Sequence, residues 1–210
     1  MDTIRQVSLN TLKRLPLYLN YLKTLDGNGN VSSTEIAKVL GLNDVQVRKD
    51  LSAVSSGGKP KVGYNVDALV SDLKEFLGYN ATKGAIIVGA GNLGRALMSY
   101  RGFSEYGLTI IAGFDSNPAL VGCKVDGKEI LSLDSLGDYC REHGVEIGVI
   151  TTPAAYAQQV SDLLVSAGIK AIWNFAPAHL YVPDGVLVQN ENMASSLALL
   201  SKHLNEMLGE

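Results

Sequence analysis

Residues 85–97, Ala-Ile-Ile-Val-Gly-Ala-Gly-Asn-Leu-Gly-Arg-Ala-Leu, decide the fold of the larger part of this 210-residue chain. An apolar run typical of a buried strand leads into the pattern GxGxxG, and a helix-forming segment follows. The next apolar run ends in Asp115, 21 residues after Gly94. The hexapeptide alone is weak evidence. The order of strand, glycine turn, helix and acidic residue, however, is typical of a βαβ unit that binds a dinucleotide.

Each part of this fingerprint has a task when a dinucleotide binds. Gly89 permits the tight turn, Gly91 lets the backbone approach the pyrophosphate, and Gly94 allows close packing of helix on strand. Asp115 would accept hydrogen bonds from the adenosine ribose and repel a 2′-phosphate, so NAD(H) is expected rather than NADP(H). The predicted cofactor contacts here are Gly89, Ala90, Gly91, Asn92, Leu93, Gly94 and Asp115.

Short apolar runs alternate with helical segments through the rest of this half. The runs are Ala85–Val88, Leu108–Phe114, Glu146–Thr151 and Lys170–Asn174. This alternation is typical of a parallel sheet with crossover helices. The sequence therefore predicts an α/β fold, with a Rossmann dinucleotide-binding domain over residues 79–189.

The first 78 residues carry helical periodicity and turn signals. Leucines from Leu15 to Leu25 recur at helical spacing over residues 12–25, with Pro16 in the first turn or breaking the helix there. A capping box from Ser32 to Glu35 starts a second helix, and residues 44–54 form a third. Two short helices around a glycine-containing turn predict a helix-turn-helix.

A basic loop after the third helix completes a winged helix. Residues 55–64 hold glycines and lysines that can form a two-stranded wing. Residues 65–77 are predicted to form an amphipathic helix, and residues 78–83 a linker. We therefore predict a winged-helix DNA-binding domain over residues 1–78.

Charge is divided unequally along the chain. The net charge is −3, with +2 in residues 1–78 and −5 in residues 79–210. A phosphate backbone favours positive charge only on the surface that faces it. Gln46 and Arg48 are predicted to reach bases, and a solvated helix face is the alternative for this helix taken alone. The predicted phosphate contacts are Lys49, Lys59 and Lys61.

A last helix is predicted over residues 190–208, within a C-terminal segment of residues 190–210. It carries an apolar stripe of Leu197, Leu200, Leu204 and Leu208. Such a stripe must be covered, either by its own domain or by a second subunit. Both possibilities remain open at this point.

Several classes of function are disfavoured. Cys123 and Cys140 lack metal-ligand or redox spacing, so no metal site is predicted. No apolar run approaches the roughly 20 residues that cross a bilayer, and no signal peptide opens the chain, so a cytoplasmic protein is expected.

The one Tyr-x-x-x-Lys match, Tyr79 to Lys83, precedes the fingerprint, and the histidines stand apart from acidic residues. No catalytic residue is predicted, and the chain is not expected to be an enzyme.

In their order along the chain, these motifs resemble the Rex-type redox-sensing transcriptional repressors. The matching segments are Arg14–Tyr18, Val31–Ser33, Gln46–Leu51, Val62–Val66, Val88–Leu97, Phe114–Asp115 and Asn174–Pro177. The resemblance implies a homodimer that exchanges its C-terminal helix and binds a palindromic, double-stranded operator. It also implies that NADH releases the DNA and that NAD⁺ permits or favours binding.

The resemblance further implies cofactor contacts near the nicotinamide, at the carboxyl ends of two strands. These residues are Thr151, Thr152, Pro153, Asn174 and Phe175. A largely apolar pocket containing Phe175 would prefer the neutral reduced ring to the cationic oxidised ring.

The same resemblance implies that Arg14 and Tyr100 couple the nucleotide site to the DNA-binding heads, together with an acidic residue on the exchanged helix. Asn192 occupies that position here, so the coupling either uses another group, such as Glu191, or is weaker. Residues 53–58 also depart from the family pattern of Tyr, Phe and Gly after the recognition helix. The wing packing and the operator sequence are therefore expected to differ from those typical of the family.

Two other functions fit parts of the sequence. One is a small NAD-dependent oxidoreductase with a DNA-binding-like module, which turnover of a carbonyl substrate would support. The other is a winged-helix regulator whose Rossmann domain senses another nucleotide or an acyl-CoA. Competition between nucleotides would separate these readings.

Overall fold

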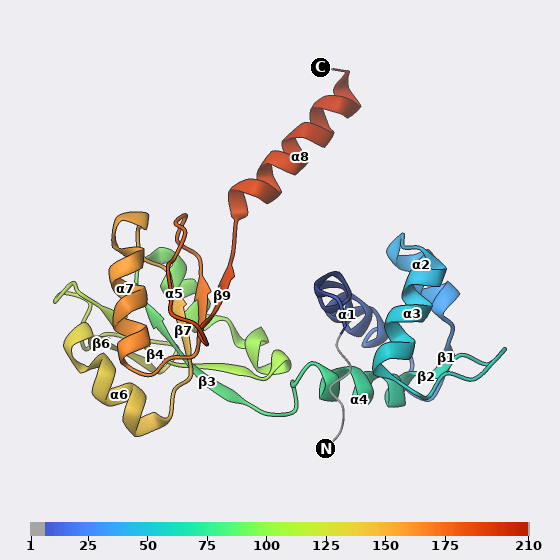
Figure 1. The fold of residues 1–210 in the computed structure, drawn as a ribbon, viewed down its shortest axis with the longest axis horizontal. Coiled ribbons are helices and arrows are strands. Elements are labelled where there is room, and N and C mark those ends of the chain that lie inside the picture. Colours follow the sequence, from blue (N-terminus) through green and yellow to red (C-terminus); the bar gives the residue numbers. More distant parts are fainter. Residues whose placement is uncertain (1–6, 210) are drawn as a thin grey trace. The chain divides into compact units, whose positions relative to one another are not determined.

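The structure is a computed structural model that describes residues 7–209, and the chain divides into two compact units between Ala81 and Thr82. Each unit has hydrophobic clusters of its own. Figure 1 labels their elements.

Unit 1 is helical, with a small antiparallel sheet. Its elements are α1 (Leu9–Leu22), β1 (Asn30–Val31), α2 (Ser33–Leu40), α3 (Asp44–Val54), β2 (Tyr64–Asn65) and α4 (Val66–Phe76). A side-chain oxygen caps each helix start, from Ser8, Ser32, Asn43 and Asn65. Gly41 ends α2 in the left-handed conformation, with φ +65°. The predicted helix-turn-helix of α2 and α3 is confirmed.

The first helix differs from its prediction. It begins at Leu9 and ends at Leu22, so Pro16 lies well inside it and the expectation of a first turn or a break at Pro16 was wrong. An internal proline costs about 3 kcal/mol, because a backbone hydrogen bond is lost and the ring crowds the preceding turn. The helix also buries leucines and Tyr18 completely. At about 2 kcal/mol for each large apolar side chain, this burial outweighs the cost of the proline.

The wing is a tight turn over residues 59–63. Lys59 and Gly63 exchange two backbone hydrogen bonds of 2.9 Å, and β2 then pairs with β1 through Val31 and Tyr64. A Cβ on Gly63 would lie 2.3 Å from the carbonyl oxygen of Val31, and its φ is +86°. Glycine is therefore required where the wing returns to the sheet.

Unit 2 is built on a largely parallel sheet with strand order β5-β6-β4-β3-β7-β8-β9, in which only β5 and β6 pair antiparallel. The strands are β3 (Lys83–Val88), β4 (Leu108–Asp115), β5 (Lys124–Val125), β6 (Lys128–Ser132), β7 (Ile147–Ile150), β8 (Ala171–Asn174) and β9 (Leu187–Asn190). The helices are α5 (Asn92–Ser99), η1 (Arg101–Tyr106), η2 (Leu133–Ser135), α6 (Leu136–His143), α7 (Ala154–Ser166) and α8 (Met193–Leu208). The predicted parallel sheet with crossover helices is confirmed.

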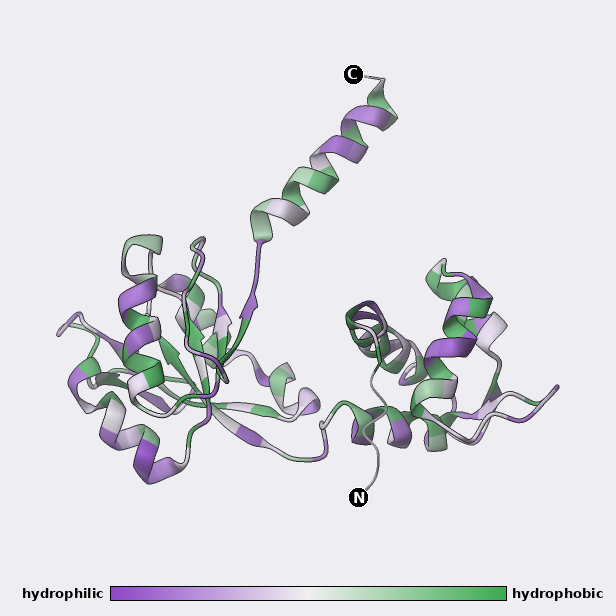
Figure 2. Ribbon diagram, viewed as in Figure 1, coloured by the Kyte–Doolittle hydropathy of each residue, from purple (hydrophilic) through white to green (hydrophobic). Residues whose placement is uncertain are grey.

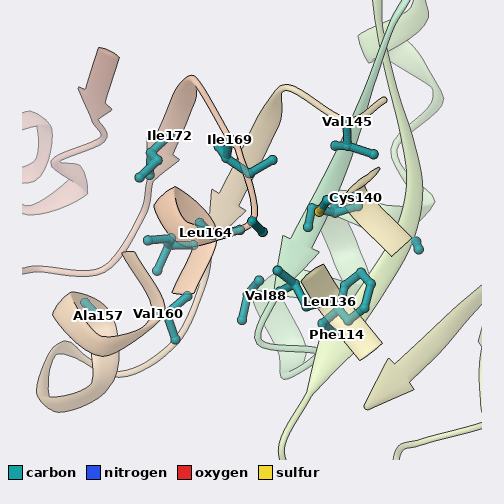
Figure 3. Packing of buried hydrophobic residues seen from close by; sticks show 14 of the residues in the cluster. Val88, Phe114, Leu136, Cys140, Val145, Ala157, Val160, Leu164, Ile169 and Ile172 are labelled. Atoms are coloured by element: carbon teal, nitrogen blue, oxygen red, sulfur yellow. The ribbon is translucent and has the colours of Figure 1, made fainter. Parts of the chain in front are cut away.

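Both faces of this sheet are buried. Figure 3 shows one face, where Leu136 and Cys140 of α6 and Leu164 of α7 pack toward Val88 and Phe114. On the other face, alternate residues of β3 pack with Met98 of α5. Because both faces are covered, the central strands are continuous apolar runs in the sequence, and this is why they were predictable.

The order of the strands reverses direction at β3, and this reversal indicates where a ligand would bind. From β3 the chain first builds β4 and β6 on one side, and it then returns to build β7, β8 and β9 on the other. Parallel sheets bind ligands outside the carboxyl ends of the strands on either side of such a reversal. Here those ends carry Gly89, Asp115 and Thr151.

The C-terminal helix begins later than predicted. Residues 187–190 form the edge strand β9, and α8 starts at Met193 after its N-cap Asn192. No residue of α8 is buried. Figure 2 shows hydrophobic and hydrophilic residues alternating along α8. The apolar stripe expected from the sequence is therefore present and exposed.

Candidate functional site

The glycine turn joins β3 to α5 at the strand reversal. Gly89 has φ +103°, and Gly91 is the N-cap of α5 without a side-chain capping bond. The first turn of a helix leaves backbone N–H groups without partners inside the helix, and it carries the positive end of the helix dipole. This helix start therefore has the donors and the charge that suit an anion.

The three glycines of the fingerprint meet different surroundings. A Cβ on Gly94 would lie 2.0 Å from the carbonyl oxygen of Gly89, and one on Gly89 would lie 2.9 Å from the backbone of Thr151. A Cβ on Gly91 would meet nothing within 4 Å. Gly89 and Gly94 thus permit close packing, whereas Gly91 leaves open space beside the turn.

Asp115 holds the turn from the end of β4. Its Oδ2 accepts a hydrogen bond of 2.7 Å from the backbone N–H of Ala90, and its Oδ1 accepts one of 2.8 Å from Asn117. Each carboxylate oxygen has more than one acceptor site, so these bonds leave capacity for ribose hydroxyls. Asp115 both organises the turn and is suited to hold a sugar.

A cavity of about 440 Å³ opens between the turn and α7. The predicted residues that line it are Gly89, Gly91, Asp115, Thr151, Thr152 and Pro153. Ala90 is buried, while Asn92, Leu93 and Gly94 form the first turn of α5 and do not line the cavity. The Thr152 hydroxyl is buried without a hydrogen-bond partner among the described residues.

Sequence reasoning missed the wall of this cavity formed by η2 and α7. The missed residues include Leu133, Tyr156, Gln159, Val160 and Leu163. Those on α7 recur at helical spacing just after the third apolar run, so the strand reversal could have indicated them. The apolar side chains suit the flat face of a base or of a nicotinamide ring.

Asn174 and Phe175 lie outside this cavity. The Asn174 side chain is fully buried, donates to the carbonyl of Ala178 at 3.0 Å and to Asn190 Oδ1 at 2.8 Å, and accepts from the backbone N–H of Ala176. Phe175 packs on Trp173, with ring centroids 4.8 Å apart, and lines a separate hollow of about 670 Å³. Neither residue lines the cavity beside the glycine turn, although Phe175 packs against the hydrophobic cluster that contains Ala90 of that turn.

The predicted DNA-contacting residues are all exposed in unit 1. Arg48, Lys59 and Lys61 line a groove of about 580 Å³ between the wing and the start of α2. Gln46 and Lys49 line another groove, of about 620 Å³, beside Arg14. Arg48 also pairs with Asp44 at 3.6 Å on the helix surface. The surface thus presents two basic grooves on either side of α3.

A buried carboxylate fixes α3 against α1. Asp50 accepts hydrogen bonds from Arg14 Nε at 2.7 Å, from the Tyr18 hydroxyl at 2.7 Å and from the Thr11 hydroxyl at 2.9 Å. Burial alone would raise the pKa of Asp50, but these donors outweigh it, so the pKa lies below its ordinary value. Burial first, and the bond to Asp50 second, raise the pKa of Tyr18 to about 12. Sequence reasoning did not single out Asp50, although it lies in the quoted segment Gln46–Leu51.

The three predicted coupling residues each have a local partner. Arg14 belongs to unit 1 and binds Asp50. Tyr100 caps the end of α5, and its ring meets Phe103 edge to face at 4.8 Å. The Asn192 side chain accepts from the backbone N–H of Ser195 as the cap of α8. The neighbouring Glu191 accepts from the Trp173 indole at 2.8 Å, so this carboxylate is already engaged.

Three further features concern metal ligands, membrane spans and cysteines within residues 7–209. In that range, His, Cys, Asp and Glu form no group of three that could hold a metal ion. No helix in the same range is long and apolar enough to cross a membrane. Cys123 and Cys140 are free thiols.

Comparison with protein families gives a match for each unit. A family model described as "CoA binding domain" matches residues 80–178, and one described as "Putative DNA-binding protein N-terminus" matches residues 6–52.

Individual relatives match nearly the whole chain. It is 44% identical over 197 residues to the redox-sensing transcriptional repressor Rex of Bacteroides fragilis, covering 93% of this chain and 90% of that protein. The crystal structure of RSP with β-NAD⁺ and operator DNA has a TM-score of 0.90 and 39% identity, covering 96% of this chain and 94% of RSP. RSP with β-NADH has a TM-score of 0.87 and 38% identity, covering 96% of this chain and 95% of RSP.

Proposed function

The chain belongs to the Rex family of redox-sensing transcriptional repressors, and from that premise we propose that unit 1 binds operator DNA while unit 2 binds NAD(H). It is a repressor and not an oxidoreductase, like the relatives it matches along nearly its full length. One observation carries the proposal. A single chain of this family has both a glycine turn that leads into a helix start without a side-chain capping bond and a winged helix whose grooves are lined by basic side chains.

The residues around the glycine turn fit a dinucleotide. The N–H groups at the start of α5 would hold the pyrophosphate, with the open space at Gly91 allowing its close approach. Asp115 would hold the adenosine ribose, and the unsatisfied Thr152 hydroxyl would bond a polar group of the ligand. When bound, NAD(H) supplies a ring whose oxidised form carries a positive charge and whose reduced form does not. A protein that distinguishes the two charges can report the redox state.

Phe175 supports a preference for the reduced ring. It lies in an aromatic series with Trp173 and Phe103, whose centroids are separated by 4.8 and 5.5 Å. An apolar face disfavours a cation, so Phe175 would favour neutral NADH, while the Glu191 carboxylate that lines the same hollow is engaged by the Trp173 indole at 2.8 Å. With Thr151 and Pro153 this aromatic series would enclose the nicotinamide end of the cofactor, and the Asn174 side chain would hold the loop in place.

Unit 1 fits the major groove of a DNA duplex. The first residues of a recognition helix contact base edges, and here they are Gln46 and Arg48 of α3. Lys49 and the wing lysines Lys59 and Lys61 would neutralise phosphates on either side. The related RSP, by its description, forms a complex with operator DNA.

A second copy of the chain would cover α8. Met193, Leu197, Leu200, Leu204 and Met207 recur at spacings of four and three residues, and each is at least 49% exposed. This spacing is that of helices that pack along a shared seam. A homodimer with exchanged α8 helices would present two α3 helices to a palindromic operator. Leu200→Glu is expected to give monomers in analytical ultracentrifugation, and a variant that remains dimeric would contradict this assignment.

The redox signal requires that NADH bind two arrangements of the dimer unequally. A coupling of about 1–3 kcal/mol is typical, and it acts in both directions. Operator DNA must therefore weaken NADH binding by the same factor. Arg14, Tyr100 and the Asn192 region would carry this coupling between the units. Because transcription is controlled at chromosomal DNA, the protein would work in the bacterial cytoplasm.

Coenzyme A is the second candidate ligand, because a model described as CoA binding matches residues 80–178. Trp173 is the sole tryptophan, and NADH absorbs where tryptophan emits. Titrating NADH, NADPH and CoA against Trp173 emission therefore separates the candidates. We expect saturable quenching by NADH that CoA does not reverse. Displacement of NADH by CoA at a lower concentration would contradict NAD(H) as the effector.

A further inference from the structure

The guanidinium of Arg14 is immobilised on one side. Its Nε and Nη2 donate to the two oxygens of Asp50 at 2.7 and 3.0 Å, the fork geometry that fits a carboxylate best. Asp50 is 5% exposed and is itself held by Tyr18 and Thr11. Rotation of Arg14 would break several bonds to a buried charge, so its orientation is fixed by the fold.

The outer edge of the same guanidinium faces Gln46. With the amide placed so that its oxygen meets these donors, Gln46 Oε1 accepts from Arg14 Nη1 at 3.0 Å and from Nη2 at 3.3 Å. An amide oxygen has two lone pairs, and these two bonds use both. The two N–H groups of Gln46 Nε2 then lie on the side of the amide away from Arg14.

Gln46 is exposed at the reading end of α3. It is the third residue of the helix, after the cap Asn43, whose side chain accepts from the Gln46 backbone N–H at 3.2 Å. Its side chain lines the groove of about 620 Å³ with Arg14 and Lys49. Residues at this position of a recognition helix contact base edges.

A glutamine with a free amide usually reads adenine with both groups, accepting from N6 and donating to N7. With its oxygen occupied, Gln46 has only donors to offer. Guanine presents two acceptors in the major groove, N7 and O6, whereas cytosine presents a donor. Donors therefore match guanine best and oppose cytosine.

We propose that Arg14 is a positioning residue that turns Gln46 into a hydrogen-bond donor, so that Gln46 selects guanine over adenine and cytosine in the operator. The inference rests on the proposed DNA-binding function. It deepens that function by assigning the chemistry of one base contact and the residue that determines it.

The test uses the full-length chain without nucleotide and a fluorescent palindromic duplex that it selects from a random pool. Each position of one half-site, with its symmetry mate, is then replaced by every base pair. Gln46→Ala identifies the position that Gln46 reads, because only there should the base preference collapse. At that position we expect the wild type to prefer guanine to cytosine by about tenfold, and guanine to adenine by a smaller factor.

The variant Arg14→Lys tests whether Arg14 orients the Gln46 amide or only stabilises the fold of unit 1. Lysine keeps the charge beside Asp50 but lacks the second edge that engages Gln46, so we expect the preference for guanine over adenine to fall to about twofold or reverse. A uniform loss of affinity with an unchanged ratio of guanine to adenine would overturn the proposal. Lys61→Ala is the matched control, and it should weaken every duplex equally.

Gln46→Glu keeps the proposal testable if Arg14→Lys does not fold. The carboxylate would still accept from Arg14 but would offer no donor, so the preferred base should change from guanine to cytosine. Retained preference for guanine would overturn the inference. Wild-type selection of adenine at this position would also overturn it while leaving the proposed function intact. A wild-type chain that selects no duplex would contradict the proposed function itself.

Discussion

The two candidate binding regions are held in shape by opposite means. In unit 1, α3 is positioned by charged and polar side chains, since Arg14, Tyr18 and Thr11 all converge on the buried Asp50. In unit 2, the close packing of the glycine turn requires the absence of side chains, since Gly94 packs against the carbonyl of Gly89, and one carboxylate, Asp115, binds the turn at Ala90.

The two regions are therefore sensitive to different changes. A network built around a buried carboxylate depends on charge, so its stability depends on pH and on keeping every partner. A turn built from closely packed backbone depends on volume, so a single methyl group can disrupt it.

The largest effect should come from the turn. Gly94→Ala would place its Cβ 2.0 Å from the Gly89 carbonyl oxygen, so we expect NADH affinity to fall more than about 100-fold, in fluorescence titration. Gly91→Ala is the matched control, because its Cβ would meet no protein atom within 4 Å. That variant should melt at the wild-type temperature and still lose about tenfold in affinity, by obstructing the pyrophosphate. Equal melting temperatures for both variants would contradict the comparison.

The next effect should come from the charge network. Asp50→Asn leaves the Arg14 guanidinium without its carboxylate, which costs about 3 kcal/mol for a pair this buried. We expect the thermal transition of unit 1 to fall by about 10–20 °C in calorimetry at pH 7. A shift below about 3 °C would show that the network does not hold α3.

The same pair predicts a pH dependence with a defined sign. The folded pKa of Asp50 lies below its ordinary value, so the ionised carboxylate stabilises the fold above the unfolded pKa of about 3.9. This contribution is lost as the pH falls through the folded pKa. The difference in free energy of unfolding between wild type and Asp50→Asn should be constant above about pH 5 and shrink below pH 4. A difference that grows in acid would contradict the ion pair.

A smaller effect is expected at Asp115. Here a charged side chain, as in unit 1, holds the glycine turn of unit 2. Asp115→Asn keeps an oxygen for the Ala90 N–H but loses the charge. We expect NADH binding to weaken about tenfold and NADPH binding to weaken less, since the repulsion of a 2′-phosphate is removed. Unchanged affinities for both NADH and NADPH would show that Asp115 does not contact the nucleotide.

The smallest effect is expected at the wing tip, where Lys61 has φ +64°. Lys61→Gly should relieve this strain and raise stability by a few tenths of a kcal/mol to 1 kcal/mol, while removing one phosphate contact. Operator affinity should fall a few-fold. The slope of log K against the logarithm of the salt concentration should become less negative by about 0.9 per half-site. An unchanged salt dependence would mean that Lys61 does not touch phosphate.

Sequence patterns predicted the parts of the fold that bury continuous or periodic apolar surface. Strands β3, β4 and β7 are largely buried on both faces, β8 is buried on one face and half-buried on the other, and α3 begins and ends at the predicted residues. The edge strand β9 was missed because only half of its four residues are apolar, Leu187 is 73% exposed and none of the four is buried, so no alternation of apolar and polar residues marks it. Pro16 was misjudged because tertiary burial overrides local propensity.

The site was predictable where backbone conformation determines residue type, and less so where side chains meet through the fold. Gly89, Gly91 and Asp115 follow from the fingerprint, and they line the cavity. The pairing of Asp50 with Arg14 joins residues 36 positions apart, and no local pattern encodes it. The aromatic wall of Phe103, Trp173 and Phe175 likewise forms only when separate strands and turns come together.

This chain is expected to couple operator binding to nucleotide sensing. The most direct test is fluorescence anisotropy of a labelled palindromic duplex from the gene's own upstream region, bound by the full-length protein at fixed salt. It is titrated with NADH and, separately, with NAD⁺. We predict release of the duplex by NADH and not by NAD⁺. Binding that responds to neither nucleotide, or equally to both, would contradict redox sensing by this chain.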